Sequence, residues 1–246
     1  MQAYVRGVFC LVIVAVISTA AFAVDGIVLI NQASVMAAGG FPYKITQSGS
    51  YKLSGNLTVP DANTSGINVL ADNVTLDLNG FSIVGPITCS GTPLACSSSG
   101  NGIGILSSAD NIAVRNGSII GMGGHGILLT GSRSLVEDIR AKFNSSVGIW
   151  LVEGTVRRCD SSQNGFSGMQ SVSGVLEGST ARGNGVYGLI GLHSTIIGNT
   201  SLNNQIGLWT SHSVYGSNSL QNNATDVLDV GGSVTQNNNI CSNGGC

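Results

Sequence analysis

Charged residues are scarce in this sequence: Asp, Glu, Lys and Arg make up 9% of 246 residues, where about 25% is usual. The formal net charge is −2, so the chain lacks the basic surplus that favours a nucleic-acid partner or an anionic membrane surface. Proline is also rare, with 4 residues, which argues against a proline-rich linker. No break in composition divides the chain, so we expect one elongated domain.

Long apolar runs are absent except at residues 8–17, which follow Arg6 and precede the Ala-Phe-Ala at 21–23. A short basic region, an apolar stretch and an A-x-A site are the parts of a secretory signal peptide. The run is shorter than the ~20 residues of a membrane span. We therefore expect residues 1–23 to be a signal peptide, and the mature protein to be secreted, periplasmic or on the cell surface, with no membrane span.

A unit of about twenty residues repeats six times between His125 and Gly244. Aligning the repeats gives one apolar, one turn, one small and one asparagine column, and an opening glycine. The apolar column holds Val136, Val156, Leu176, Ile196, Val214 and Val234, and the turn column holds Ile139, Cys159, Ser179, Asn199, Ser217 and Asn237. The small column holds Ala141, Ser161, Ala181, Ser201, Ser219 and Asn239, and the asparagine column holds Asn144, Asn164, Asn184, Asn204, Asn222 and Ser242. The opening glycines are Gly126, Gly148, Gly168, Gly188 and Gly207.

The short runs within each repeat favour strands over helices, because Gly, Asn and Ser interrupt them every three to five residues. A single repeat cannot bury its own apolar side chains, but repeats stacked at ~4.8 Å per rung turn each column into a continuous ladder. Asparagine suits the turns, because it tolerates the left-handed region and its amide can bond to the rungs above and below. The repeat therefore predicts an all-β, single-stranded parallel β-helix, a solenoid.

The pattern Gly-Ile-x-Leu…Val-x-x-Cys-x-Ser-x-x-Asn-Gly at residues 148–165 resembles the repeat of right-handed parallel β-helix proteins, the pectate-lyase-like superfamily. The resemblance covers residues 66–243. It implies a right-handed helix and, because many members of that superfamily cleave or epimerise acidic polysaccharides, an exported carbohydrate-active protein.

The segments outside the regular repeat suggest the domain organisation. An open solenoid end exposes strand edges and needs a cap, so we expect residues 24–65 to form an N-terminal cap and the first strands, with a short helix at 30–38. Residues 66–246 then form the β-helix, and residues 86–100 form a loop inserted between two early coils.

Five cysteines remain after residue 23. Cys89 and Cys96 bracket the inserted loop, and Cys241 and Cys246 lie at the end of the sequence, so in an exported protein we expect two local disulfides. Cys159 occupies the turn column and is expected to be a buried free thiol. No second Cys or His shares its column, and we expect no metal and no cofactor.

The segment Gly124-His125-Gly126 resembles the Gly-His-Gly of polygalacturonases, which share this fold. The Asn-Thr-Asp, Asp-Asp and Arg-Ile-Lys that accompany it in that family are missing, so no carboxylate pair for glycoside hydrolysis is present.

The densest charges, at residues 137–160, align with opposite signs on neighbouring rungs. Glu137, Arg157 and Glu177 share a column, Asp138 faces Arg158, and Arg140 faces Asp160. Such exposed pairs help to fix the register. The remaining cations Lys44, Lys52, Lys142 and Arg182 are scattered in the alignment, whereas a uronate-acting enzyme would gather unpaired cations in a groove.

Five residues after the opening glycines stand Gly131, Glu153, Ser173, His193 and His212. His193 and His212 would lie on successive rungs, with Glu153 two rungs from His193. Adjacent histidines can act as general base and acid or share a metal, which makes these three the candidate catalytic residues. The alternative interpretation is a solvated turn.

Trp150 and Trp209 stand two residues after an opening glycine and would face outward on the same sheet, three rungs or ~14 Å apart. Exposed indoles can stack on sugar rings, or they can pack against a loop, a tail or another subunit. We therefore predict a protein that binds or processes a polysaccharide or cell-surface glycan through Trp150 and Trp209. As an enzyme it would be a lyase, hydrolase or epimerase. The alternative is a non-catalytic structural or adhesive solenoid.

Overall fold

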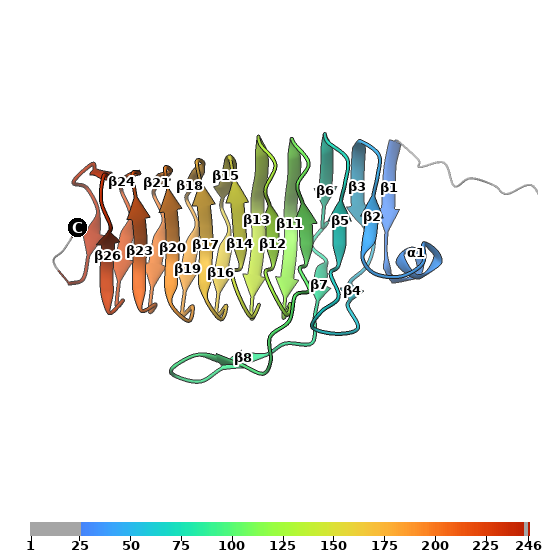
Figure 1. Ribbon diagram of the computed structural model, residues 1–246, viewed down its shortest axis with the longest axis horizontal. Coiled ribbons are helices and arrows are strands. Elements are labelled where there is room, and N and C mark those ends of the chain that lie inside the picture. Colours follow the sequence, from blue (N-terminus) through green and yellow to red (C-terminus); the bar gives the residue numbers. More distant parts are fainter. Residues whose placement is uncertain (1–25, 244–245) are drawn as a thin grey trace, which may run out of the picture.

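The computed structural model describes residues 26–243 and 246, and these residues form a parallel β-solenoid of about 11 turns with one short helix. The coils stack along one axis into an elongated molecule (Figure 1). The all-β parallel solenoid predicted from the repeat is thereby confirmed. The predicted signal peptide at 1–23 lies outside the described residues. No helix in the described ranges is long and apolar enough to cross a membrane.

One face of the solenoid is a nine-stranded parallel sheet. Its strands are β2 (Tyr43–Ile45), β5 (Ile67–Val69), β10 (Ile105–Ser107), β12 (Ile127–Leu129), β14 (Ile149–Val152), β17 (Ser167–Val172), β20 (Tyr187–Leu192), β23 (Ile206–Ser211) and β26 (Thr225–Asp229). Each coil contributes one strand, and each strand pairs only with strands of the coils before and after it, as β17 does with β14 and β20.

A seventeen-stranded sheet forms the other two faces as two parallel rows. The first row is β1 (Ile27–Ile30), β3 (Gly49–Leu53), β6 (Val74–Asp77), β11 (Ile112–Ile120), β13 (Ser134–Lys142), β15 (Gly154–Arg157), β18 (Val175–Glu177), β21 (Thr195–Ile197), β24 (Val214–Gly216) and β27 (Val234–Thr235). The second row is β4 (Leu57–Thr58), β7 (Ser82–Val84), the C-terminal halves of β11 and β13, β16 (Asp160–Ser162), β19 (Thr180–Arg182), β22 (Thr200–Leu202), β25 (Ser219–Gln221) and β28 (Ile240–Cys241).

The chain turns at three corners of each coil, and at each corner one residue has a positive φ. The first corner, which leads from the nine-stranded sheet to the first row, holds Arg133, Glu153, Ser173, His193 and His212. The second corner, between the rows, holds Asp138, Arg158, Gly178, Gly198 and Ser217, and the third, which returns to the nine-stranded sheet, holds Phe143, Gln163, Gly183, Asn203 and Asn222. A φ near +55° lets a single residue redirect the chain, and Gly and Asn adopt it at least cost.

The interior is filled by the predicted columns as far as Ile196. Val136 pairs with Val156, Val156 with Leu176, and Leu176 with Ile196, and all four side chains are 0% exposed. The next partner is Tyr215 and not Val214, so the predicted register is wrong by one residue in this coil, and by up to two residues in the last coil.

The apolar pattern offers two adjacent residues at this point, and the structure buries Tyr215, which is 6% exposed, while Val214 is 39% exposed. A one-residue slip moves every side chain of a strand to the opposite face. Val234, predicted to be in the core, is accordingly 61% exposed. The other columns shift with it and continue through Asn218 and Asn239, Leu220 and Cys241, and Asn223.

The asparagine column forms a buried hydrogen-bonded ladder beside the third corner. Asn164 Nδ2 donates to Asn184 Oδ1 at 3.1 Å, and Asn164 Oδ1 accepts from Asn144 Nδ2 at 2.9 Å. The predicted bonding between rungs is confirmed. The left-handed conformation is not at these asparagines but one residue earlier, at Gln163 and its equivalents, because a left-handed residue there turns the next side chain into the interior.

The helix α1 (Gln32–Ala37) lies at the N-terminal end of the solenoid (Figure 1). Asn31 caps it, accepting from the Ser34 N–H, while Ser34 Oγ accepts from the Asn31 N–H. Val35 is fully buried in the core. The helix lies in the segment where the sequence predicts an N-terminal cap, and β1 already pairs in register with β3.

The inserted loop is a small hairpin of β8 (Cys89–Ser90) and β9 (Ala95–Cys96) that projects from the early coils beside later ones (Figure 1). A Cys89–Cys96 disulfide closes it, and a second disulfide joins Cys241 to Cys246. Cys159 is a buried free thiol. All three cysteine predictions are confirmed in the structure.

Cys159 should resist alkylation in the folded protein. Burial raises the pKa of its thiol to about 12, so the nucleophilic thiolate is scarce at neutral pH. We expect iodoacetamide at pH 7.5 to label the Cys159 peptide only after denaturation, as measured by peptide mass mapping without reduction. Rapid labelling of Cys159 in the native protein would contradict its position in the core.

Charged residues pair across rungs as predicted for Glu137 with Arg157 and for Asp138 with Arg158, but Glu177 forms no ion pair among the described residues and Asp160 has a different partner. Glu137 accepts from both Arg157 and Arg158, and Arg158 also binds Asp138. Asp160 is in register with Arg140 but pairs with Arg182 of the following coil. The guanidinium of Arg182 therefore lies on the carboxylate that the alignment had assigned to Arg140.

Replacing one ladder cation should have little effect on stability. We expect Arg157→Ser to cost well under ~1 kcal/mol, because the pair is partly exposed and Arg158 stays on Glu137. The hydrogen bond from Arg157 is the largest cause that lowers the pKa of Glu137. Because its pKa is lowered in the folded state, Glu137 stabilises the fold at pH values above its ordinary pKa. That contribution is lost as the pH falls and Glu137 becomes protonated. The difference between variant and wild type should therefore vanish in acid, as measured by urea unfolding across pH 3 to 7.

Candidate functional site

The outer face of the nine-stranded sheet carries both tryptophans in one column. Trp150 pairs with Gln170, Gln170 with Ile190, and Ile190 with Trp209. Trp150 and Trp209 are therefore three rungs apart, as predicted, and both are half-buried. Ile190 between them is 5% exposed, so the surface connecting them is filled rather than open.

Each tryptophan belongs to a different aromatic group. Trp150 lies edge-on to His125, with ring centroids 5.2 Å apart. Trp209 is tilted against Tyr187 at 6.2 Å, and Tyr187 lies edge-on to Phe166 at 5.4 Å. Phe166, Tyr187 and Trp209 come from three successive coils, and we call them the aromatic strip.

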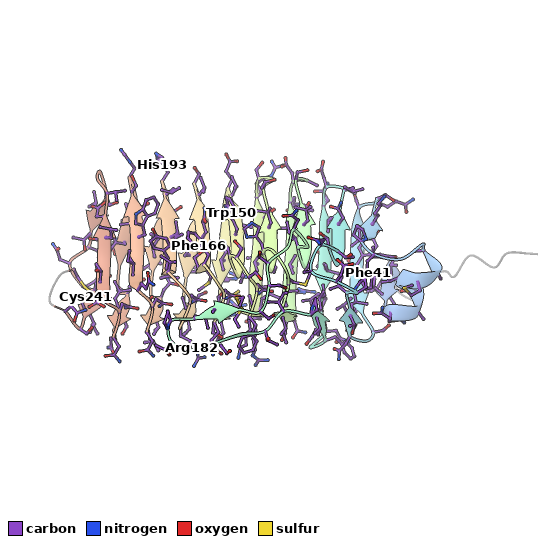
Figure 2. All side chains as sticks on the ribbon, turned by 60° about the horizontal axis from the view of Figure 1, so that its bottom comes forward. Phe41, Trp150, Phe166, Arg182, His193 and Cys241 are labelled. Atoms are coloured by element: carbon purple, nitrogen blue, oxygen red, sulfur yellow. A yellow bond between two sulfur atoms is a disulfide. The ribbon has the colours of Figure 1, made fainter. Side chains whose placement is uncertain are left out.

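The sequence analysis did not identify Phe166 and Tyr187. The sequence contained a signal for them, because an aromatic residue follows the Asn-Gly pair in two successive repeats. Phe166 comes directly after Asn164-Gly165, and Tyr187 comes two residues after Gly185. Both segments start at the third corner, so their side chains reach the same edge of the nine-stranded sheet. Phe166 is 41% exposed and lies on the middle coils (Figure 2).

The indole N–H of Trp150 is buried without a hydrogen-bond partner among the described residues, and so is a serine hydroxyl of the next coil, Ser167 Oγ. His125 Nδ1 accepts from the Val147 N–H at 3.3 Å, and burial lowers the pKa of His125. A neutral imidazole with an accepting Nδ1 carries its proton on Nε2, so His125 offers one donor beside the buried indole.

The first corner brings the two candidate histidines together. The rings of His193 and His212 are stacked, with centroids 5.2 Å apart and planes inclined by 17°, and His212 Nδ1 is 2.8 Å from Ser211 Oγ. Figure 2 shows His193 at the margin of the sheet. Parallel rings cannot direct their lone pairs at one ion, because coordination takes place in the ring plane, so this arrangement does not form a chelate.

Glu153 stands in the same corner column, separated from His193 by Ser173. Two rungs correspond to about 9.6 Å along the axis, so the structure does not bring Glu153 into hydrogen-bonding distance of the histidine pair. The sequence alignment placed Gly131 in this column, which is wrong. Arg133 occupies the position and donates its N–H to the Glu153 carbonyl, because the preceding coil is two residues longer.

Two of the cations that the alignment scattered share one hollow. Lys142 and Arg182 line a depression of about 310 Å³ beside the third corner, together with Gln163 and Asn203. Lys142 and Arg182 are each in register with Ser162, on opposite sides, and Arg182 is bound to Asp160. The expectation that these two cations are unrelated is wrong for this pair, whereas Lys44 lies apart, near Ala38 and Pro42.

No protein-family model matches the sequence, and no curated protein matches it. Among solved structures, the A-module of a mannuronan C-5 epimerase from Azotobacter vinelandii superposes with a TM-score of 0.48 at 14% identity, over 80% of this chain and 75% of that one. A pectate lyase gives a TM-score of 0.45 at 15% identity, over 84% and 73%. The Dettilon tailspike protein gives 0.40 at 12% identity, over 85% and 60%.

These similarities concern the fold, a parallel β-solenoid. The strand pairing of the chain itself makes it a parallel β-solenoid protein, with a half-buried aromatic face and a hairpin closed by a disulfide. Its activity has to be argued from its own side chains.

Proposed function

We propose that the protein binds a polysaccharide on the outer face of the nine-stranded sheet, along the solenoid axis. The aromatic strip is the observation that supports this most strongly, since Phe166, Tyr187 and Trp209 present ring surface on three successive coils. Sugar rings expose flat C–H faces that aromatic rings can cover, and the polar ends of Tyr and Trp can bind hydroxyl groups.

Trp150 extends this surface in the N-terminal direction, and His193 and His212 border it at the first corner. His125 Nε2, beside Trp150, is a donor that suits an oxygen atom of a glycan. Two local disulfides support an exported protein that meets its glycan outside the cell, since disulfides persist in oxidising compartments.

A processing activity is the second candidate, and the stacked histidine pair favours it. Two imidazoles on adjacent rungs can divide the roles of base and acid in an elimination or epimerisation. A purely structural or adhesive solenoid is the alternative. It is favoured by the charged ladder at the second corner, whose members bind one another.

The test is a glycan array, followed on each bound glycan by assays for new reducing ends, for unsaturated products and for a change in sugar configuration. Binding without a product supports a binding protein, and a product that disappears in His193→Ala or His212→Ala supports processing. If no glycan is retained at all, the proposal is wrong.

A further inference from the structure

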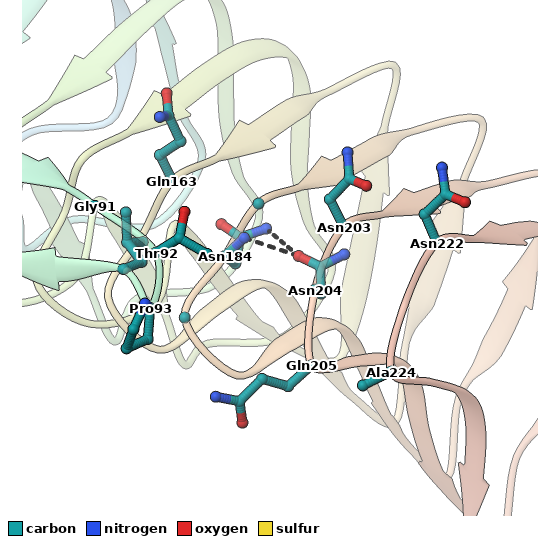
Figure 3. A pocket seen from close by; sticks show the side chains of 13 residues that line it. Gly91, Thr92, Pro93, Gln163, Asn184, Asn203, Asn204, Gln205, Asn222 and Ala224 are labelled. Carbon is teal, nitrogen blue, oxygen red and sulfur yellow. Dashed lines mark hydrogen bonds between the residues drawn. The ribbon is translucent and has the colours of Figure 1, made fainter.

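A groove lies between the disulfide hairpin and the third corner, and no residue of the aromatic strip is among its described lining residues. It has a volume of about 650 Å³, which is within the range of ligand sites. Thr92 and Pro93 at the hairpin tip form one wall, and Gln163, Asn203 and Asn222 lie along the other (Figure 3). Gln205 lines the side that faces the nine-stranded sheet.

The hairpin is attached at its base and stands off at its tip. Ser145 Oγ donates to the Ser98 carbonyl at 2.6 Å, and the Cys96 sulfur lies against Gly165, where an added Cβ would come within 3.0 Å of it. Among the described residues, no hydrogen bond joins residues 91–94 to the corner beneath them. The tip therefore forms a wall without filling the space.

The second wall is a row of amide side chains with free hydrogen-bonding groups. Gln163, Asn203 and Asn222 occupy the positive-φ position of their coils, which directs them outward, while the neighbouring asparagines of the ladder point inward and bond to one another. Within the described part of the chain, the side-chain amides of Gln163, Asn203 and Asn222 have no hydrogen-bond partner. Each can both donate and accept.

The groove carries no charged side chain among its described lining residues. Hydroxyl groups, like amides, both donate and accept, so a row of amides suits a chain of hydroxyl groups. Pro93 and Leu94 offer apolar surface for the C–H side of a sugar ring. Carboxylates would call for cations in the groove, and the nearest, Lys142 and Arg182, line the adjoining hollow.

A bound peptide fits these features less well. Extended peptides commonly add to a free strand edge, but the corner backbone is already paired between coils, as Gly183 N–H is to the Leu202 carbonyl and Asn203 N–H to the Gln221 carbonyl.

We propose that this groove is a second binding site and that its ligand is an uncharged, hydroxyl-rich glycan segment. Its lining residues differ from those of the aromatic strip, and it shares with the proposed function only the class of ligand. An uncharged ligand also distinguishes it from the acidic polysaccharides that the sequence resemblance implies.

The test variant is Asn203→Gly with Asn222→Gly, because Gly183 already occupies the same corner position on a neighbouring coil and glycine keeps the positive φ without strain. Asn237→Gly is the matched control, with a φ of 56° and an exposed position outside the groove. Binding to a soluble mixed-linkage β-glucan, galactomannan, dextran and polygalacturonate is measured by affinity electrophoresis and calorimetry, beside Trp209→Ala.

We expect wild type and Asn237→Gly to bind at least one neutral polymer equally, and the double variant to bind it about tenfold more weakly, as two lost hydrogen bonds imply. The inference is overturned if the double variant binds as wild type does, or if only polygalacturonate is bound. If only Trp209→Ala weakens glycan binding, the proposed function is supported and the groove is not a binding site. If only the double variant weakens glycan binding, the groove is the binding site and the aromatic strip is not. No binding of any polymer would overturn both.

Discussion

Asn164→Leu should destabilise the solenoid by about 3 kcal/mol or more, the upper end of the cost of leaving buried polar groups unpaired. Asn164 is 0% exposed, and its amide joins three coils. Its Nδ2 donates to the Ala141 carbonyl, Ser161 Oγ and Asn184 Oδ1, and its Oδ1 accepts from the N–H and Nδ2 of Asn144. Leucine has the same branching as asparagine but is larger, and it leaves these partners without bonds in the buried interior.

The measurement is urea unfolding followed by circular dichroism, with Gln170→Leu as the control. Gln170 lies in the next strand of the same coil, β17, and its side chain is half-exposed on the outer face, so the same kind of substitution should stay within about 0.5 kcal/mol. An Asn164→Leu variant as stable as Gln170→Leu, or less damaged than Arg157→Ser, would mean that the ladder contributes little and that apolar packing alone sets the register.

The repeat made the architecture predictable, because the same few physical requirements recur in the sequence of every coil. Small and apolar residues recur where side chains enter the core, and asparagine recurs where an amide must meet its copies above and below. The prediction failed where the repeat offered two equivalent choices, as at Val214 and Tyr215, since a column alignment cannot weigh the packing of a large ring against that of a smaller side chain.

The candidate site was less predictable, because it depends on side-chain direction and on segments that do not repeat. The columns were sufficient to place Trp150 and Trp209 on one face and His193 beside His212. They could not show that Arg182 reaches Asp160, because reach depends on rotamers. Nor could they place the hairpin at residues 89–96 beside later coils, since an inserted loop has no counterpart in the other repeats.

Replacing Trp150 and Trp209 together with alanine should abolish glycan retention. Sequence reasoning alone predicts that the melting temperature stays nearly unchanged, since outward indoles were expected to be free of packing. The structure alters that part of the prediction. Trp150 is half-buried with its Nε1 covered and packs on His125, so its loss should lower stability, whereas Trp209 packs only loosely against Tyr187.

The single variants therefore separate binding from packing. We expect Trp209→Ala to bind glycan far more weakly with a melting temperature close to that of wild type, because it removes stacking surface from the aromatic strip. Leu228→Ala is the control, one rung further along the same column and 38% exposed, and it should keep both binding and stability. The measurement is retention on a glycan column beside thermal unfolding. If Trp209→Ala retains glycan as wild type does, or loses it only because the protein unfolds, the indole is a packing residue and the aromatic strip is not the binding surface.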